Sequence, residues 1–477
     1  MNPTVLPVRT RSLALRARPL SRGHSWAAAA AAVAVFAFGA FAAPAVSAAG
    51  TGSWTQIASM STMRDYHAGT LLADGRVLEV GSYSMTYLGH YAEAYNPVTG
   101  TWQTLVPDAI SNFNETVNQL ASGKVLIAGG WAGPGNTTNR TQLLDVNTGA
   151  LVDTGFLNVI RHNHASVLLA DGRVLVAGGE GDTRGIGLGS GSTAEIYDPA
   201  TAVWTKVAPL SIDRPRPTAA LLPDGRVLVV GSTSSSYAGS GEIYDPAANT
   251  WTPTGPLPNN TGGVNHAMTV LADGRVLAVG GSNGTDGFAD TAIYDPSTNQ
   301  WQAAAPMGLG RSFHTATLLK DGRVLVVGGT QVNVNWTSEI YDPSTNRWAS
   351  GPTLNHRRDL HTAVAMADGR VLVAGTTLAT DADKVSAEVF YADGVAAPPP
   401  TWNLAVRTFV QKNTDQATLT WSSQPTTTTY WVWFNNTLVG STTKTTFTHN
   451  TGLKGHRTGT YQICGNAPTC PSITATW

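Results

Sequence analysis

Histidine and arginine recur in this chain at two fixed positions, and both side chains could bind ligands or take part in acid–base chemistry. One position lies seven residues before each of seven Asp-Gly or Ser-Gly pairs, and the other lies three residues earlier. The first position holds His67, Glu115, His164, Pro217, His266, His314 and His361. The second position holds Arg64, Asn112, Arg161, Arg214, Gly263, Arg311 and Arg358. Imidazole titrates near neutral pH, and guanidinium groups pair with carboxylates.

Three interpretations of these positions are open, and we favour the first. A structural role, with hydrogen bonds to backbone between repeats, would explain repetition at fixed spacing. An arc of Arg could instead bind anions, and a lyase acting on acidic polysaccharide would add a His that removes the α-proton. The residues of such a catalytic arc would be His67, His266, His314, His361, Arg64, Arg311 and Arg358. Metal binding would need several imidazole nitrogens about 2.0–2.1 Å from one ion, and no His-x-x-x-His spacing enforces that.

Each of these positions leads into an apolar stretch, as the sixth copy illustrates. There, Thr317–Leu319 precedes Asp321-Gly322, and a second apolar run ends at Gly328-Gly329. Asp-Gly between two such runs predicts a β-hairpin with a type I′ turn, which needs positive φ at both central residues. Further along, Tyr341–Pro343 and Trp348 predict a third and a fourth strand. Seven such units about 49 residues apart predict an all-β propeller of seven blades.

The tandem glycines, the Tyr and the Trp closely resemble kelch repeats, over residues 51 to 394. The resemblance implies a seven-bladed kelch β-propeller like the central domain of galactose oxidase and its copper-radical relatives. Those enzymes need a Tyr cross-linked to a Cys beside copper. The two cysteines of this chain, Cys464 and Cys470, both follow the repeats. We therefore expect the fold without that activity, and neither a metal nor another cofactor.

The N-terminal segment is expected to close the propeller. Trp54 lies in a stretch typical of an outer strand, whereas the seventh repeat ends near Tyr391 without a Trp strand. Pairing of these two segments would remove both open edges. The second repeat departs most from the pattern, since Ser122 replaces Asp and only Leu151–Val152 could supply its outer strand.

The loops between the second and third strands should open on the same face as the Arg and His positions. They are rich in Gly, Ser, Thr and Asn and also carry large aromatic residues. Such aromatics are typical of surfaces that bind sugar rings or peptides, although each could instead pack against its own loop. The candidate ligand-binding residues are Tyr83, Tyr87, Trp131, Tyr237, Phe288, Trp336, Arg64, Arg161, Arg311 and Arg358.

Both ends of the chain lie outside the repeats. Residues 1–49 combine Arg residues, an Ala-rich apolar run and small residues near Ala48, which predicts a cleaved signal peptide rather than a membrane anchor. The propeller is expected at 50–395 and a Pro-rich linker at 396–401. Residues 402–477 alternate like strands, and Trp421 and Tyr461 resemble those of a fibronectin type III-like sandwich. Cys464 and Cys470 are expected to form a disulfide in an exported chain.

Composition narrows the possible partners. The chain has 477 residues, a net charge of −1 and 13% charged residues, so nothing favours nucleic acid or an anionic membrane as partner. We expect a secreted extracellular monomer that is not inserted in a membrane after cleavage. Its expected function is non-catalytic binding of polysaccharide or of another extracellular protein, and the alternative is the lyase described above.

Overall fold

The computed structural model describes residues 52–81, 92–106, 113–131, 137–181, 190–231, 240–259, 261–331, 333–377, 381–392, 405–411, 414–420, 430–435, 437–444, 446–451, 458–464 and 472–476. The predicted signal peptide and linker lie outside these residues, as do Tyr83, Tyr87, Tyr237 and Cys470. The disulfide therefore stays a prediction.

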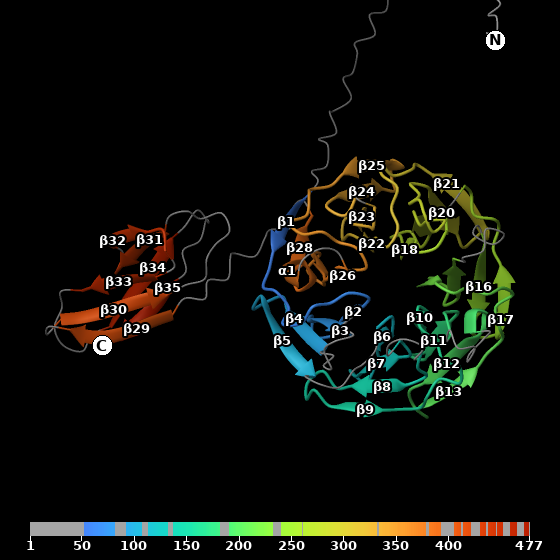
Figure 1. Ribbon diagram of the computed structural model, residues 1–477, viewed down its shortest axis with the longest axis horizontal. Coiled ribbons are helices and arrows are strands. Elements are labelled where there is room, and N and C mark those ends of the chain that lie inside the picture. The colour runs from blue at the N-terminus through green and yellow to red at the C-terminus, as the bar shows by residue number, and fades with distance from the viewer. Residues whose placement is uncertain are drawn as a thin grey trace, which may run out of the picture. The chain divides into compact units, whose positions relative to one another are not determined.

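Seven antiparallel sheets of four strands each surround a central axis, which confirms the predicted propeller (Figure 1). The inner strands are β2 (Ala68–Leu71), β6 (Thr116–Gln119), β10 (Ala165–Leu168), β14 (Thr218–Leu221), β18 (Ala267–Val270), β22 (Thr315–Leu318) and β26 (Thr362–Ala365). The second strands are β3 (Val77–Val80), β7 (Val125–Ala128), β11 (Val174–Ala177), β15 (Val227–Val230), β19 (Val276–Val279), β23 (Val324–Val327) and β27 (Val371–Ala374). The third strands are β4 (Ala92–Asn96), β8 (Thr141–Leu144), β12 (Ala194–Asp198), β16 (Gly241–Asp245), β20 (Thr291–Asp295), β24 (Ser338–Asp342) and β28 (Ala387–Tyr391). The outer strands are β5 (Thr101–Val106), β9 (Leu151–Asp153), β13 (Val203–Lys206), β17 (Thr250–Pro253), β21 (Gln300–Ala304), β25 (Arg347–Ser350) and β1 (Ser53–Gln56).

The N-terminal strand closes the ring, as predicted. β1 pairs antiparallel with β28, so that Trp54 lies opposite Phe390 with ring centroids 5.2 Å apart. The Trp54 indole also donates to the backbone oxygen of Pro352, at 3.2 Å. Blade seven is thus assembled from both ends of the propeller sequence, and β9 supplies the degenerate outer strand of blade two.

The core lies between blades, because the second strand of each blade is buried along its whole length. The outer strands are joined to the core by a repeated Tyr–Trp pair. In blade six, Tyr341 lies opposite Trp348 with centroids 5.0 Å apart. The Trp348 indole donates to the backbone oxygen of Ala305 in the preceding blade, at 2.7 Å. The Tyr–Trp pair, which recurs in five blades, therefore connects neighbouring blades as well as neighbouring strands.

The inner hairpins exist as predicted, but their turns are not type I′. Gly322 has φ of 89°, whereas Asp321 is not among the residues with positive φ. The Gly322 amide donates to the Leu319 oxygen, and the Leu319 amide donates to the Arg323 oxygen. This is a type I turn followed by a left-handed glycine, in which Asp321 accepts the Arg323 amide hydrogen bond. In this turn the left-handed conformation falls on Gly322, and the Asp321 side chain accepts a local hydrogen bond.

Two small antiparallel sheets follow the propeller. One contains β29 (Ala405–Gln411), β30 (Thr414–Thr420) and β33 (Thr446–Asn450), in that order. The other has the order β32 (Thr437–Thr442), β31 (Tyr430–Phe434), β34 (Thr458–Cys464), β35 (Ser472–Thr476). The sequence did not predict β32, whose pairing with β31 is interrupted by a bulge between Val432 and Trp433.

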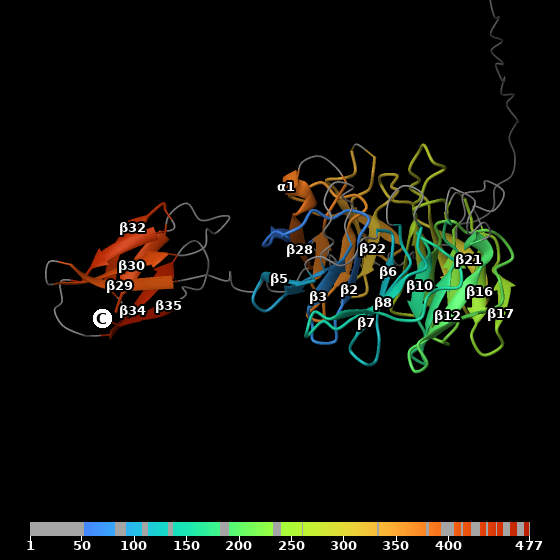
Figure 2. The same ribbon diagram turned by 60° about the horizontal axis from the view of Figure 1, so that its bottom comes forward.

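Helices are minor among the described residues. They comprise the 3₁₀ turn η1 (Ser190–Ser192) and the single turn α1 (Asp381–Lys384), which projects from the ring (Figure 2). Within the described ranges, no helix is long and apolar enough to cross a membrane.

Candidate functional site

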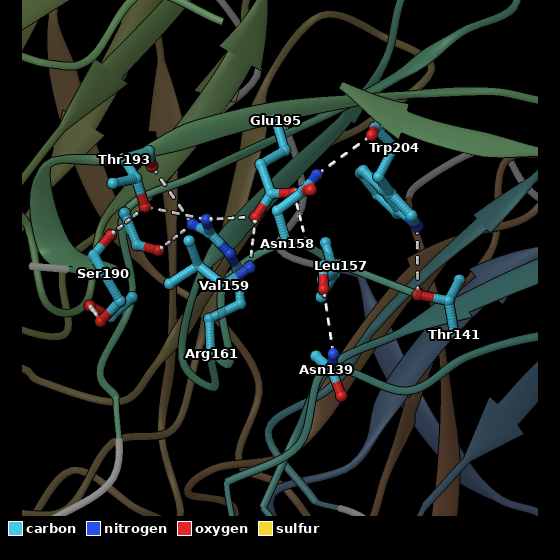
Figure 3. A network of polar contacts seen from close by, with 12 residues as sticks. Asn139, Thr141, Leu157, Asn158, Val159, Arg161, Ser190, Thr193, Glu195 and Trp204 are labelled. Atoms are coloured by element: carbon cyan, nitrogen blue, oxygen red, sulfur yellow. Dashed lines mark hydrogen bonds and ion pairs between the residues drawn. The ribbon is translucent and has the colours of Figure 1, made fainter. Parts of the chain in front are cut away.

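The repeated arginines are part of the blades rather than of an exposed surface. Arg161 donates to Glu195 on β12 at 2.9 Å and to the backbone oxygen of Gly178 at 2.7 Å (Figure 3). Glu195 also accepts the amide hydrogens of Asn158 at 2.7 Å and Val159 at 3.0 Å. The ion pair therefore holds the segment that enters the blade against the third strand of that blade.

The same arrangement occurs in five blades, and each of its arginines is essentially inaccessible to solvent. The pairs are Arg64–Glu93, Arg161–Glu195, Arg214–Glu242, Arg311–Glu339 and Arg358–Glu388. Because every guanidinium is already paired with a carboxylate, these side chains are unavailable to an external anion. The predicted anion-binding or catalytic role of Arg64, Arg161, Arg311 and Arg358 does not fit this geometry. They have a structural role, although their bonds lie within a blade and not between blades as predicted.

The glutamates of these pairs were missed in the sequence, although a signal was present. Each lies two residues before the third-strand Tyr, or before Phe390 in blade seven. The two repeats without Arg also lack Glu: Gly263 accompanies Ala292, and Asn112 accompanies Gln142. Paired loss of Arg and Glu within one chain is what a contact between them predicts.

One cavity of about 310 Å³ lies where all seven inner strands begin. In every blade, its lining comes from the position seven residues before the hairpin pair and from the residue before that position. The cavity therefore lies on the axis of the ring. The lining residues are Tyr66, His67, Asn114, Glu115, Asn163, His164, Arg216, Pro217, Thr218, Asn265, His266, Phe313, His314, Leu360 and His361. The sequence correctly predicted that the His positions surround one mouth of the axial channel.

Four of the five cavity histidines hydrogen-bond to the neighbouring blade, whereas neither ring nitrogen of His314 has a side-chain partner among the described residues. His361 Nε2 lies 2.9 Å from Thr315 Oγ1, and His266 Nε2 lies 2.7 Å from Thr218 Oγ1. His67 and His164 have equivalent threonine partners at 3.3 and 3.0 Å. Burial lowers the pKa of His266 to about 4 and the pKa of the other three well below the usual range. At neutral pH these imidazoles are uncharged groups that bind one blade to the next.

The residue before each His position adopts a strained backbone conformation. Six of the seven residues have positive φ between 48° and 60°. They are Tyr66, Asn114, Asn163, Asn265, Phe313 and Leu360. Asn tolerates this region, but Tyr, Phe and Leu do so at a cost of about 1–2 kcal/mol each. Backbone hydrogen bonds maintain it, such as Phe313 N–H to the Asn265 oxygen at 3.0 Å and Leu360 N–H to the Phe313 oxygen at 3.2 Å. We call these six residues and Arg216 the mouth ring.

The mouth ring is divided by chemistry into two arcs. Asn114, Asn163, Arg216 and Asn265 follow one another in blades two to five. Phe313, Leu360 and Tyr66 follow in blades six, seven and one. The cavity thus has amide and guanidinium groups along one side of its opening and apolar or aromatic groups along the other.

Trp131 supports the polar arc from behind. Its ring packs against Phe113, with centroids 4.7 Å apart, and against His162 at 5.9 Å. His162 Nε2 lies 3.1 Å from Glu180, whose other oxygen accepts from Arg216 at 2.8 Å. Burial would raise the pKa of Glu180, but hydrogen bonds from His162 and Arg216 outweigh it and lower the pKa to about 2. Trp131 is half-buried in this network, so its aromatic face is used for packing.

The other two described loop aromatics differ in exposure. Phe288 is half-buried, and its segment pairs with that of Arg311. Trp336 is 37% exposed, with the Arg357 guanidinium 5.3 Å from its ring centroid. Of the predicted aromatic residues, Trp336 is therefore the one described side chain that offers a substantial surface to a ligand.

Two buried carboxyl groups near the mouth were not singled out as a site in the sequence. Glu79 on β3 occupies a position that is Val, Ile or Ala in the other blades, and it faces Gly69. It accepts from Thr362 at 2.8 Å and lies 3.4 Å from His67 Nε2. Burial raises the pKa of Glu79 to about 8. Glu115 occupies the His position of blade two and lines the cavity.

The comparisons with known proteins agree on the fold. Residues 116–329 match the model of the KLHDC2/KLHL20/DRC7 Kelch-repeats domain. A solved structure, described as a novel fungal alcohol oxidase of the AA5 family in complex with copper, has a TM-score of 0.60 at 20% identity. The alignment covers 90% of this chain and all of that one. Among curated proteins there is no significant match.

At 20% identity, the similarity to that oxidase concerns the fold and does not extend to its copper. The described residues contain no group of three or more His, Cys, Asp or Glu side chains arranged to hold a metal ion. The cavity imidazoles are spread around the ring, and four of them bond to threonines of the preceding blade. The similarity is therefore one of kelch propeller architecture.

Proposed function

We propose that this protein is an exported, non-catalytic module that binds polysaccharide at the mouth ring. The observation that carries the proposal is the division of that ring into a polar arc and an apolar arc. A pyranose ring has an apolar face of C–H groups and an edge of hydroxyl groups. Tyr66 and Phe313 suit the former, and the Asn side chains suit the latter, because an amide can both donate and accept hydrogen bonds.

The size and rigidity of the site support a small polar ligand. A volume of about 310 Å³ is at the lower end of ligand pockets, which span roughly 300–1,000 Å³. This favours one sugar residue of a longer chain. The mouth ring is held by backbone hydrogen bonds between blades, so little ordering is needed on binding. A protein partner would need about 800 Å² of contact on each side, and the apolar arc consists of only three side chains.

Catalysis on acidic polysaccharide is not favoured. The lyase alternative requires an arginine that neutralises the substrate carboxylate. Arg64, Arg311 and Arg358 are buried and paired with Glu93, Glu339 and Glu388, and Arg216 is paired with Glu180. These compensated charges therefore argue against acidic glycans.

Export and the second module belong to the same proposal. The Arg-containing, Ala-rich N-terminus supports secretion. The order β29-β30-β33 and β32-β31-β34-β35 supports a fibronectin type III-like sandwich, a type of module that often accompanies bacterial carbohydrate-active proteins. In that arrangement the propeller provides the specific site.

A glycan array with the mature protein tests the proposal, followed by calorimetry with the best glycan. Phe313→Ala should weaken binding about five- to thirtyfold, corresponding to about 1–2 kcal/mol of lost contact with the sugar face. Its fold should be retained, because Ala keeps the Cβ that Phe313 already has and so adds no strain at this positive φ. The matched control is Phe156→Ala, which removes an exposed ring that does not line the cavity. Equal effects of both substitutions, or no glycan binding, would refute the proposal.

A further inference from the structure

Glu115 interrupts the repeated chemistry of the cavity. Five blades have His at this position, and Pro217 occupies it in blade four. Where the His has a threonine partner, the threonine begins the inner strand of the preceding blade. Before Glu115 that position is Ala68, which offers no side-chain hydrogen bond. Glu115 therefore lines the cavity without the hydroxyl partner that four of the five histidines have, as does His314, which follows Ala267.

The Glu115 carboxyl group is buried and unsatisfied. The residue is 5% exposed, and neither carboxyl oxygen has a hydrogen-bond partner among the described residues. Leaving such a group unpaired typically costs about 1–3 kcal/mol, and more for a charged group. Among the described residues that line the cavity, several imidazole nitrogens also lack a partner, but Glu115 is the one side chain with two unpartnered carboxyl oxygens.

The charges around the cavity indicate which kind of ligand would suit Glu115. Arg64, the cation that acts on Glu115, is already paired with Glu93, and Arg216 is paired with Glu180. The side chains that flank Glu115 are His67 and His164, and their pKa values are lowered well below the usual range by burial, so they are uncharged. Glu115 is the one carboxyl group among the described residues that line the cavity, and it has no cation of its own.

We propose that Glu115 determines specificity by binding a primary ammonium group, so that the glycan at the mouth ring contains a free-amine hexosamine. This rests on the proposed function and adds its substrate class. The ammonium group would donate to the two unpartnered oxygens, and the Asn oxygens and the aromatic faces of Tyr66 and Phe313 also suit a cation. An N-acetylated sugar would place an amide against Glu115 and would supply no positive charge to favour its carboxylate form.

The pH dependence of binding follows from the same geometry. Burial raises the pKa of Glu115 well above the usual range and outweighs the opposing effects of its own backbone amide and of Arg64. Binding of the ammonium group favours the carboxylate, so a proton is released below the raised pKa. Affinity should rise with pH and then fall once the amine itself loses its proton.

The experiment is calorimetric titration with glucosamine oligosaccharides and with the same oligosaccharides after N-acetylation. The wild type should bind the free-amine form about ten- to a hundredfold more tightly, the range expected for charge-assisted hydrogen bonds. Glu115→Gln, which keeps the shape, should remove this preference and abolish proton release measured in buffers of different ionisation enthalpy. The matched control, Asp153→Asn, removes an exposed carboxylate on β9 and should behave as wild type.

Each outcome separates this inference from the proposed function. Tighter binding of the N-acetylated form, or equal binding of both forms, would overturn the role of Glu115 while leaving glycan binding intact. Retention of the amine preference in a folded Glu115→Gln variant would also overturn it. If neither oligosaccharide binds while another glycan does, the amine inference fails alone; if no glycan binds, both proposals fail.

Discussion

Separate and combined replacement of Arg311 and Glu339 should reveal how the buried ion pairs stabilise the propeller. Arg311 donates to Glu339 at 2.9 Å, to the Gly328 oxygen at 2.8 Å and to Thr337 Oγ1 at 2.9 Å, with no exposed surface. Arg311→Ala leaves the Glu339 carboxylate with hydrogen bonds from only the backbone amides of Gly308 and Leu309. Removal of one partner from a buried pair costs about 3–5 kcal/mol, because the other charge remains unpaired.

The double variant should cost far less than the sum of the two single variants. Glu339→Ala strands the guanidinium and should also cost about 3–5 kcal/mol. Arg311→Ala combined with Glu339→Ala removes both charges, and blade five already folds with Gly263 and Ala292 at these positions. We expect the double variant to be about as destabilised as one single variant, which gives a coupling energy of about 3–5 kcal/mol.

Urea unfolding followed by tryptophan fluorescence measures all four proteins of this cycle. The matched control is Ala292→Glu in blade five, which should be destabilising because Gly263 provides no guanidinium. If the double variant loses the sum of the single effects, the pair is not coupled, and the arginine acts through its backbone contacts alone. That result would refute the interpretation that these arginines stabilise each blade through their buried ion pair with glutamate.

Two further predictions concern ring closure and pH. Deletion of residues 52–58 should lower the melting temperature sharply or cause aggregation, because it exposes Phe390 and the edge of β28; a truncated protein that melts like the full chain would show that β1 is dispensable. For Glu180 the pKa is lowered to about 2 from an ordinary value of 4.5, so its contribution to stability is present above about pH 4.5 and is lost as pH falls towards 2. Glu180→Gln should lack this acid-dependent loss in thermal melts between pH 7 and 2, and an unchanged pH dependence would contradict the assigned pairs with His162 and Arg216.

Much of the fold could be predicted because it is repeated in the sequence. Seven copies of the glycine-ended hairpin and the later Tyr and Trp determine the number of blades and strands. The missing partner strands at the two ends correctly indicated closure through Trp54. The turn type was predicted wrongly, because Asp-Gly also fits a type I turn followed by a left-handed Gly, in which the Asp side chain accepts a local hydrogen bond. β32 was missed because Gly440 and a bulge weaken its pattern.

The site was only partly predictable. Spacing placed the His positions around the axial mouth, but it could not show that Arg161 and its equivalents point into their own blades towards a glutamate. The mouth ring depends on positive φ angles, and residue types such as Phe313 and Leu360 do not predict positive φ. Likewise Glu115 resembles one more departure in a degenerate repeat until its burial and unpartnered oxygens are known.

The most direct test of the account is a crystal structure of the mature protein with the tightest glycan from the array. We expect one sugar residue in the axial cavity, with its apolar face over Phe313 or Tyr66 and its hydroxyl groups towards Asn114, Asn163 or Asn265. A sugar bound on the outer strands, at Trp336 alone or on the sheets formed by β29–β35, with the cavity empty, would contradict the central claim.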